Sequence, residues 1–140
     1  MSQTVEAREH ARQQARAHLE SIVELVEAIE TAQINQEADF EGDTLDLEEL
    51  EERAREWPLS ILVRSDWVSP GSEMVAAEYE LLLCTGGPAV RIRGDLSEYQ
   101  QPINAHLEHQ DWFTPWDRAS LSSGESDALL RFASLFWFGE

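Results

Sequence analysis

The sequence has no lysine, one cysteine and no long apolar run, and each absence removes a class of function. All ten basic residues are arginines, so a catalytic or Schiff-base lysine is excluded. Cys84 has no second cysteine to pair with, which excludes an internal disulfide and favours a reducing compartment. No apolar run reaches the length of about 18 residues that a membrane span needs, and the first residues lack the apolar segment of a signal peptide. We therefore expect a cytoplasmic protein.

Acidic residues dominate what is present. The chain has 28 Asp and Glu against 10 Arg, which gives a net charge of -18 in 140 residues. This charge repels phosphate backbones and anionic lipid at long range, so we expect no direct binding to nucleic acid or to membranes. A basic protein is the partner that the charge favours. Hydrophobic residues still make up 42% of the chain, which is enough for a folded core.

Two helices are predicted before residue 58. Apolar residues recur at steps of three and four between residues 4 and 33, with no Gly or Pro, and this pattern predicts one long helix. Residues 35–43, which include Gly42, break the pattern. A second helix is predicted after Asp46, because Asp46 and Glu49 have the spacing of a capping box, and it ends at Pro58.

From residue 59 the hydrophobic period changes to two, which predicts antiparallel strands. Four runs are expected to be strands, at residues 59–64, 78–84, 89–94 and 103–112. The predicted register sets Leu81 opposite Ile92, Glu80 opposite Arg93, Leu83 opposite Val90, Val90 opposite Leu107, Ile92 opposite Ala105 and Arg91 opposite His106. A closing helix is predicted from the capping-box pair Ser122 and Glu125 to residue 137.

The expected fold class is therefore α+β. It consists of two N-terminal helices, a four-stranded antiparallel meander sheet and a C-terminal helix packed on the sheet. We expect a single domain over residues 1–140, with an acidic helical part at residues 1–58 and the sheet with its closing helix at residues 59–140.

The acidic residues are concentrated in one segment. Residues 37–56 hold ten carboxylates and two arginines, and three further glutamates share one face of the first predicted helix. A fixed array of carboxylates at this density can substitute for phosphates in the basic groove of a nucleic-acid-binding protein. The predicted partner-binding residues are Glu20, Glu24, Glu27, Asp43, Asp46, Glu48, Glu49, Glu51 and Glu52. The competing interpretation is a solvated acidic surface, or one adapted to high salt.

The first helix also carries Arg8, Arg12 and Arg16 at intervals of four residues. Cations near a helix start and acids near its end oppose the helix macrodipole, so we expect compensating partners. The arginines could pair with the acidic segment of the same chain or of a second copy, which would give a homodimer. Screening by solvent is the other explanation.

No metal site, cofactor or catalytic signature is predicted. His106 and His109 are three residues apart in a predicted strand, so their rings should point to opposite faces. Cys84 ends an apolar strand, which favours a buried structural thiol. The alternative to a binding protein is a ligand-binding or enzymatic domain with a pocket near Cys84, Arg91, His106 and Trp112.

Two stretches carry a resemblance. The sequence LLLCTGGPAVRIRGDL at residues 81–96 and QDWFTPW at residues 110–116 resemble a motif pair of small, largely uncharacterised proteins carried by bacteria, phages and plasmids. The resemblance covers roughly residues 59–138 and brings no catalytic residues. It implies a mobile-element setting, in which small acidic proteins block restriction or CRISPR machinery. The first hypothesis is therefore a non-enzymatic acidic protein that acts as a DNA mimic on such a basic partner.

Overall fold

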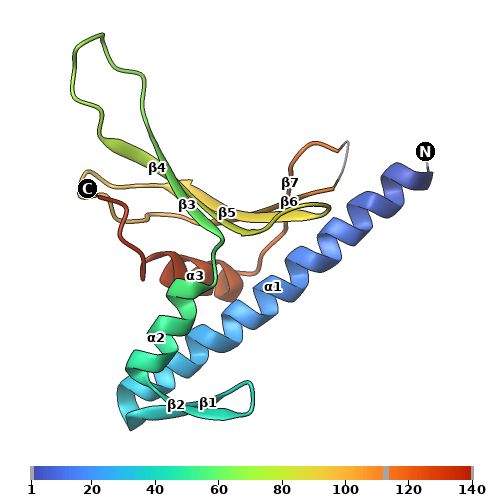
Figure 1. Cartoon of the computed structure of the whole chain (residues 1–140), viewed down its shortest axis with the longest axis vertical. Coiled ribbons are helices and arrows are strands. Elements are labelled where there is room, and N and C mark those ends of the chain that lie inside the picture. Colours follow the sequence, from blue (N-terminus) through green and yellow to red (C-terminus); the bar gives the residue numbers. More distant parts are fainter. Residues whose placement is uncertain (1, 112–113, 140) are drawn as a thin grey trace.

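The chain folds into three helices, a five-stranded antiparallel sheet and a separate two-stranded hairpin (Figure 1). The computed structural model describes residues 2–111 and 114–139. Its elements are α1 (Ser2–Asn35), β1 (Glu37–Phe40), β2 (Asp43–Asp46), α2 (Leu47–Glu56), β3 (Ser60–Ser65), β4 (Ala76–Cys84), β5 (Ala89–Asp95), β6 (His106–Gln110), β7 (Asp117–Arg118) and α3 (Ser123–Ala133). The α+β class is confirmed. The prediction of four strands is wrong, because β7 adds a fifth strand and the expected break after α1 is a hairpin.

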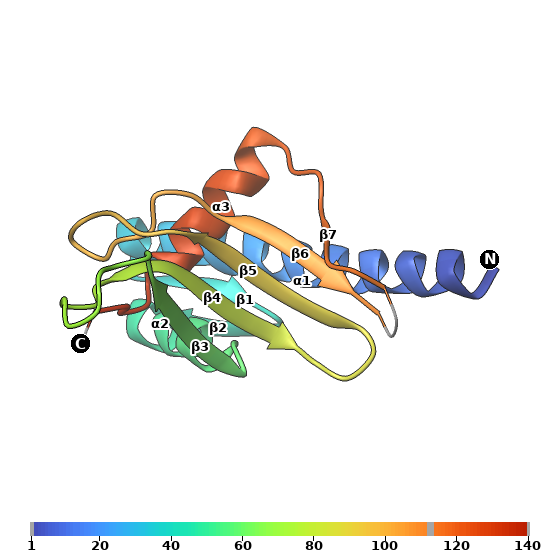
Figure 2. The same cartoon turned by 90° about the horizontal axis from the view of Figure 1, so that it is seen from above.

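α1 runs along one face of the sheet and supplies much of the core. The apolar residues that recur at steps of three and four in this helix are buried, namely Ala11, Ala15, Leu19, Ile22, Val26 and Ile29. They recur at steps of three and four, so they form one stripe along the helix. The stripe begins with alanines beside β6 and continues with larger side chains, while the first turns extend past the sheet (Figure 2).

The β1–β2 hairpin and α2 cap the C-terminal end of α1. Glu41 and Gly42 form the hairpin turn with positive φ angles of 51° and 84°. Phe40 and Leu45 turn inward and are buried, which anchors an otherwise acidic hairpin to the core. The predicted capping box of α2 is confirmed: the Glu49 backbone N–H donates to the Asp46 side chain at 2.8 Å. This cap fixes where the hairpin ends and α2 begins.

The five strands follow one another in chain order, so the predicted meander is confirmed. Leu81 pairs with Ile92 and Glu80 with Arg93, as predicted. The predicted pairing of Leu83 with Val90 is wrong, because a bulge after Leu82 sets Cys84 opposite Val90.

The predicted register between β5 and β6 is wrong by two residues. Ile92 pairs with Leu107, and Arg93, not Arg91, lies opposite His106. Val90 therefore pairs with His109 in place of Leu107. A shift of two residues keeps every side chain on its predicted face, so the hydrophobic pattern alone does not distinguish the two registers.

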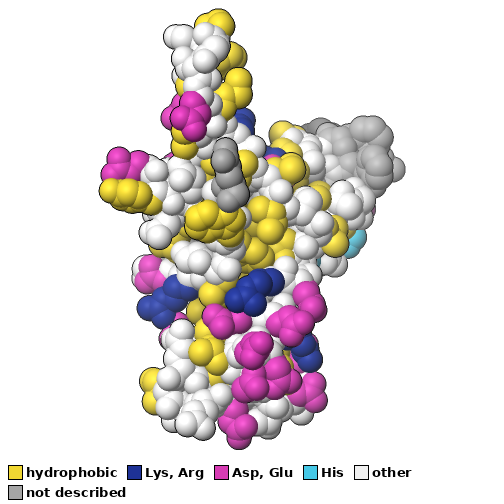
Figure 3. Space-filling model, turned by 60° about the vertical axis from the view of Figure 1, so that its left-hand side comes forward, with side chains coloured by type: hydrophobic (Ala, Val, Ile, Leu, Met, Phe, Trp, Pro, Cys, Tyr) yellow, Lys and Arg dark blue, Asp and Glu magenta, His cyan; other side chains and the backbone are white. Residues whose placement is uncertain are grey.

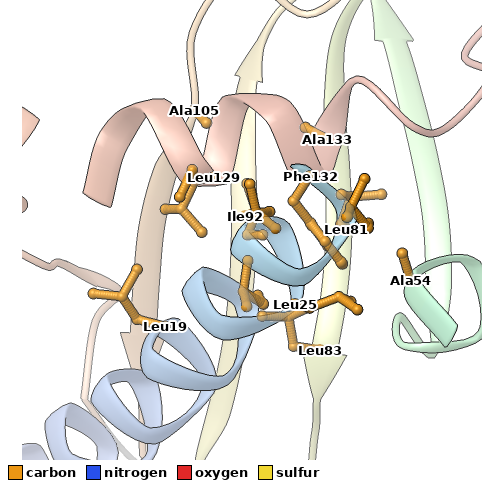
Figure 4. Packing of buried hydrophobic residues seen from close by; sticks show 14 of the residues in the cluster. Leu19, Leu25, Ala54, Leu81, Leu83, Ile92, Ala105, Leu129, Phe132 and Ala133 are labelled. Atoms are coloured by element: carbon orange, nitrogen blue, oxygen red, sulfur yellow. The ribbon is translucent and has the colours of Figure 1, made fainter. Parts of the chain in front are cut away.

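The core lies between the sheet and the layer of α1 and α3. Figure 4 shows Leu81, Leu83 and Ile92 of the sheet pointing at Leu25 of α1 and at Leu129 and Phe132 of α3. These side chains are at most 4% exposed, and burying each one fully contributes about 1.5–3 kcal/mol. α3 also contacts α1, and Arg131 forms an ion pair with Glu30 across that contact.

The outer face of the sheet carries a charged network in which carboxylates and arginines alternate. Glu108 is buried and accepts from Arg91 at 2.8 Å, with Arg118 at 3.5 Å and Arg93 at 3.8 Å. Arg91 also lies 3.8 Å from the centre of the Trp116 ring, in a cation–π contact. The network continues through Glu80, Glu78 and Arg64, and the hydrogen bond from Arg64 lowers the pKa of Glu78.

At the end opposite α2, the loop between β3 and β4 projects beyond the body (Figure 1). We call residues 66–75 the β3–β4 arm. Its exposed large hydrophobic side chains are Trp67, Val68, Met74 and Val75, and β3 itself exposes Leu62 and Val63. β3 forms an edge of the sheet, and a register shift between Arg64 and Ser65 ends its regular pairing. No helix in the described part of the chain is long and apolar enough to cross a membrane.

Candidate functional site

The predicted partner-binding carboxylates lie on three adjoining elements. Glu20, Glu24 and Glu27 are exposed on α1, and Asp43 and Asp46 are exposed on β2. Glu48, Glu49 and Glu52 are exposed on α2, where Glu51 is half-buried. α1 contacts both the hairpin and α2, which brings the three sets to the same end of the molecule. In Figure 3 the acidic side chains gather at the end that holds α2 and the hairpin.

Two structural observations connect these elements. Glu24 and Glu27 of α1 line a cavity of about 320 Å³ together with Asp39 and Glu41 of the hairpin. Arg53 of α2 reaches Glu41 at 3.6 Å and Asp43 at 3.7 Å. The fold thus brings together carboxylates that are far apart in the sequence. We use the name acidic surface for all the carboxylates on three elements: α1 from Glu20 onward, the β1–β2 hairpin, and α2.

Most members of the acidic surface have no arginine partner. The exceptions among the predicted residues are Glu20, which pairs with Arg16 at 3.8 Å, and Asp43, which pairs with Arg53. Asp46 and Glu49 hold the α2 capping box. Within residues 2–111 and 114–139, no ion pair involves the remaining five, Glu24, Glu27, Glu48, Glu51 and Glu52.

Asp39 and Glu41 were missing from the predicted binding residues. Both residues belong to the acidic segment at residues 37–56, but it is the hairpin that places them beside Glu24 and Glu27. The signal that identifies them is the Glu41–Gly42 turn flanked by inward Phe40 and Leu45. Alternation around a glycine turn predicts a hairpin, although strands this short and this acidic have low β propensity.

Among the described residues, the cavity that Arg91 lines does not include the other members of the alternative pocket. Arg91 lines a cavity of about 230 Å³ with side chains of β3, β4 and Arg93, and neither Cys84 nor His106 belongs to its lining. The Cys84 thiol donates to the Pro88 carbonyl at 3.8 Å, and burial raises the pKa of this thiol, so it is a poor nucleophile. His106 lies opposite Arg93 on the outer face of the sheet. Trp112 lies outside the described residues.

Of the alternatives for the Arg8, Arg12 and Arg16 ladder, pairing with residues 37–56 of the same chain is not seen among the described residues. Arg8 lies 3.7 Å from Asp117 and Arg12 lies 3.7 Å from Glu9, while Arg16 lies 2.9 Å from Glu125 and 3.8 Å from Glu20. The expected cost against the macrodipole is also small, since α1 runs from Ser2 to Asn35, its first turn (residues 2–5) holds no arginine and its last turn (residues 32–35) holds no acid. The macrodipole acts only within those terminal turns.

The chemistry of the acidic surface is that of a fixed anion array. Among the described residues, no group of three or more His, Cys, Asp or Glu side chains is arranged to hold a metal ion. The surface offers carboxylate oxygens to guanidinium and ammonium donors, which are the groups that basic proteins use for phosphates. No protein-family model, no curated protein and no solved structure matches this chain.

Proposed function

We propose that this protein is a non-enzymatic binding protein whose acidic surface docks on a basic, nucleic-acid-handling protein. The acidic surface acts as a DNA mimic, and restriction or CRISPR-type machinery is the class of partner. The observation that carries the proposal is the set of carboxylates without ion-pair partners, Glu24, Glu27, Glu48, Glu51 and Glu52, on elements that adjoin. A basic groove supplies the counter-charges that residues 2–111 and 114–139 do not.

The spacing of these carboxylates supports the proposal. Glu20, Glu24 and Glu27 follow one face of α1, and Glu48 and Glu52 are one turn apart on α2. Like charges at this spacing repel, at a cost of about 0.2–0.5 kcal/mol per pair. Binding to a basic groove replaces the repulsion with attraction and releases the counterions of the groove. The net charge of -18 also accelerates encounter with a basic partner, and salt weakens this effect.

A solvated acidic surface is the competing explanation, and it predicts no specific partner. The experiment that separates the two uses the full chain as bait at low and high salt. The captured protein is then purified and tested for nucleic-acid binding with and without the bait. We expect a basic partner whose capture weakens with salt and whose nucleic-acid binding the bait displaces. A partner that still binds nucleic acid beside the bait contradicts the proposal.

Two matched variants locate the interaction. The first carries Glu48→Arg, Glu51→Arg and Glu52→Arg, and it spares Glu49 because that side chain closes the α2 capping box. The control reverses three exposed carboxylates elsewhere, Glu73, Glu98 and Asp127. Both variants change the net charge equally. We expect the first to lose the partner and the control to keep it, while equal losses would assign the effect to net charge alone.

A further inference from the structure

A cavity between α1 and the last two strands is lined by arginines. Arg8, Arg12 and Arg16 of α1 line it together with His109 of β6 and Arg118 of β7. Its volume is about 650 Å³, which is within the range of small-molecule sites, roughly 300–1,000 Å³. Figure 2 shows the N-terminal half of α1 running past β6 and β7. The arginine ladder of the sequence is thus one wall of this cavity.

Arginines outnumber carboxylates in the lining of the cavity. Arg8, Arg12 and Arg16 line it against Glu9 and Asp117. Arg118 also borders the cavity, but its guanidinium pairs with Glu108 of the outer-face network at 3.5 Å, and Arg16 pairs with Glu125 at 2.9 Å and with Glu20 at 3.8 Å. Two of the internal ion pairs are long, since Arg8 to Asp117 and Arg12 to Glu9 each measure 3.7 Å. The Arg12 side chain is 73% exposed. Because each guanidinium has five N–H donors, these pairs leave most donors of the ladder free for a ligand.

His109 is a second and independent observation at the same place. The residue is 5% exposed, and its Nδ1 atom has no hydrogen-bond partner within the described chain. A buried polar atom without a partner costs about 1–3 kcal/mol, so structures rarely keep one without a reason. His109 lines the cavity between the arginines of α1 and Asp117.

We propose that this cavity binds a small phosphate-bearing molecule. One arginine satisfies a carboxylate, whereas a phosphoryl group presents three oxygens and up to two charges, which suits several guanidinium groups around one space. The apolar part of the lining, Val5, Leu19, Leu107 and Ala119, suits a carbon body attached to the phosphate. A nucleic-acid strand is a poor occupant, because the net charge of -18 repels a polyanion at long range.

The test is an NMR titration of the full chain with inorganic pyrophosphate at constant ionic strength. We expect saturable shifts of the side-chain Nε–Hε signals of Arg8, Arg12, Arg16 and Arg118 and of the ring nitrogens of His109. Arg12→Gln is expected to weaken binding about tenfold, as the loss of a hydrogen bond from a charged donor predicts. Arg55→Gln, an exposed arginine on α2, is the matched control and should bind as the wild type does.

Three results would overturn the proposal. Shifts that do not saturate, or that are as large at Arg55 as in the cavity, would mean that pyrophosphate acts only as a non-specific counterion. Equal affinity for citrate would show that the cavity recognises charge and not phosphate. An unchanged His109 signal in a folded wild-type protein would remove the buried ring from the site. The result is independent of the acidic surface, since none of these residues belongs to it.

Discussion

The outer face of the sheet and the acidic surface are both rich in glutamate, but they differ in whether these glutamates pair with arginines. On the sheet, Glu78, Glu80 and Glu108 each lie within 4 Å of at least one arginine. On the acidic surface, Glu48 and Glu52 have none among the described residues. The paired glutamates of the sheet stabilise the fold, whereas the unpaired glutamates of the acidic surface interact with solvent or with a partner. The same substitution should therefore change the free energy of unfolding more on the sheet than on the acidic surface.

The largest difference is expected for Glu108, the centre of the sheet network. Glu108→Gln should lower the free energy of unfolding by about 2–4 kcal/mol, because Arg91 and Arg93 would lose the buried carboxylate that they share. Glu48→Gln on the acidic surface should change stability by less than about 0.5 kcal/mol. Urea unfolding measures both variants, and equal effects would erase the distinction between the two regions.

Within the acidic surface, one carboxylate has a structural role. Asp46→Ala should cost about 1 kcal/mol, because it removes the acceptor for the Glu49 backbone N–H at the start of α2. Glu52→Ala is the matched control, since this glutamate is exposed and its side chain makes no hydrogen bond within the described chain. Thermal unfolding compares the two. A loss at Glu52 as large as the loss at Asp46 would mean that the cap contributes nothing.

Lowering the pH from 7 to 5.5 should lower the free energy of unfolding, because the half-buried His18 and the buried His109 resist protonation in the folded state. Burial lowers the pKa of His109 and of His18 below their ordinary value of 6.5, so the unfolded chain binds more protons than the folded one below that pH. Stability is therefore complete above pH 6.5 and falls as the pH drops toward the folded pKa values.

Urea midpoints between pH 7.5 and 5.5 test this expectation. His109→Asn should flatten the dependence, whatever its effect on stability at pH 7.5. His10→Asn is the control, because His10 is exposed. A midpoint that rises toward pH 5.5 would show that relief of repulsion on the acidic surface outweighs the buried imidazoles.

The smallest expected effect is that of salt. Raising the salt concentration should stabilise the wild-type chain by a few tenths of a kcal/mol, because it screens repulsion among the unpaired carboxylates. A variant with Glu48→Gln, Glu51→Gln and Glu52→Gln should lose part of that response. Urea unfolding at 0.05 and 0.5 M NaCl measures it. An unchanged response would assign the repulsion to other charges of the chain.

Helices could be predicted well from this sequence because their signals are local. The stripe from Ala11 to Ile29 and the capping boxes at Asp46 and Ser122 involve residues at most four positions apart, and the structure confirms them. The C-terminal helix nevertheless ends at Ala133, short of the predicted Trp137, although apolar residues continue. An apolar run without a stop signal does not specify where a helix ends.

Strand pairing and the cavities depended on information that the sequence does not carry locally. The bulge after Leu82 and the two-residue shift of β6 keep the same faces buried, so the alternation of apolar residues is equally satisfied by either register. The acidic surface could be predicted as a set of charged residues, but its joining to Asp39 and Glu41 depended on an unforeseen hairpin. The meeting of Arg12 with His109 likewise required the packing of α1 on β6.

The β3–β4 arm gives the molecule an electrical polarity. Its only charged residues are Asp66 and Glu73, and it lies at the opposite end of the long axis from the acidic surface (Figures 1 and 3). A protein with its excess negative charge at one end has a large dipole moment. The positive potential around a basic partner orients that end toward the partner. A basic partner would therefore meet α2 and the hairpin first, with Trp67 and the rest of the arm pointing into the bulk solution.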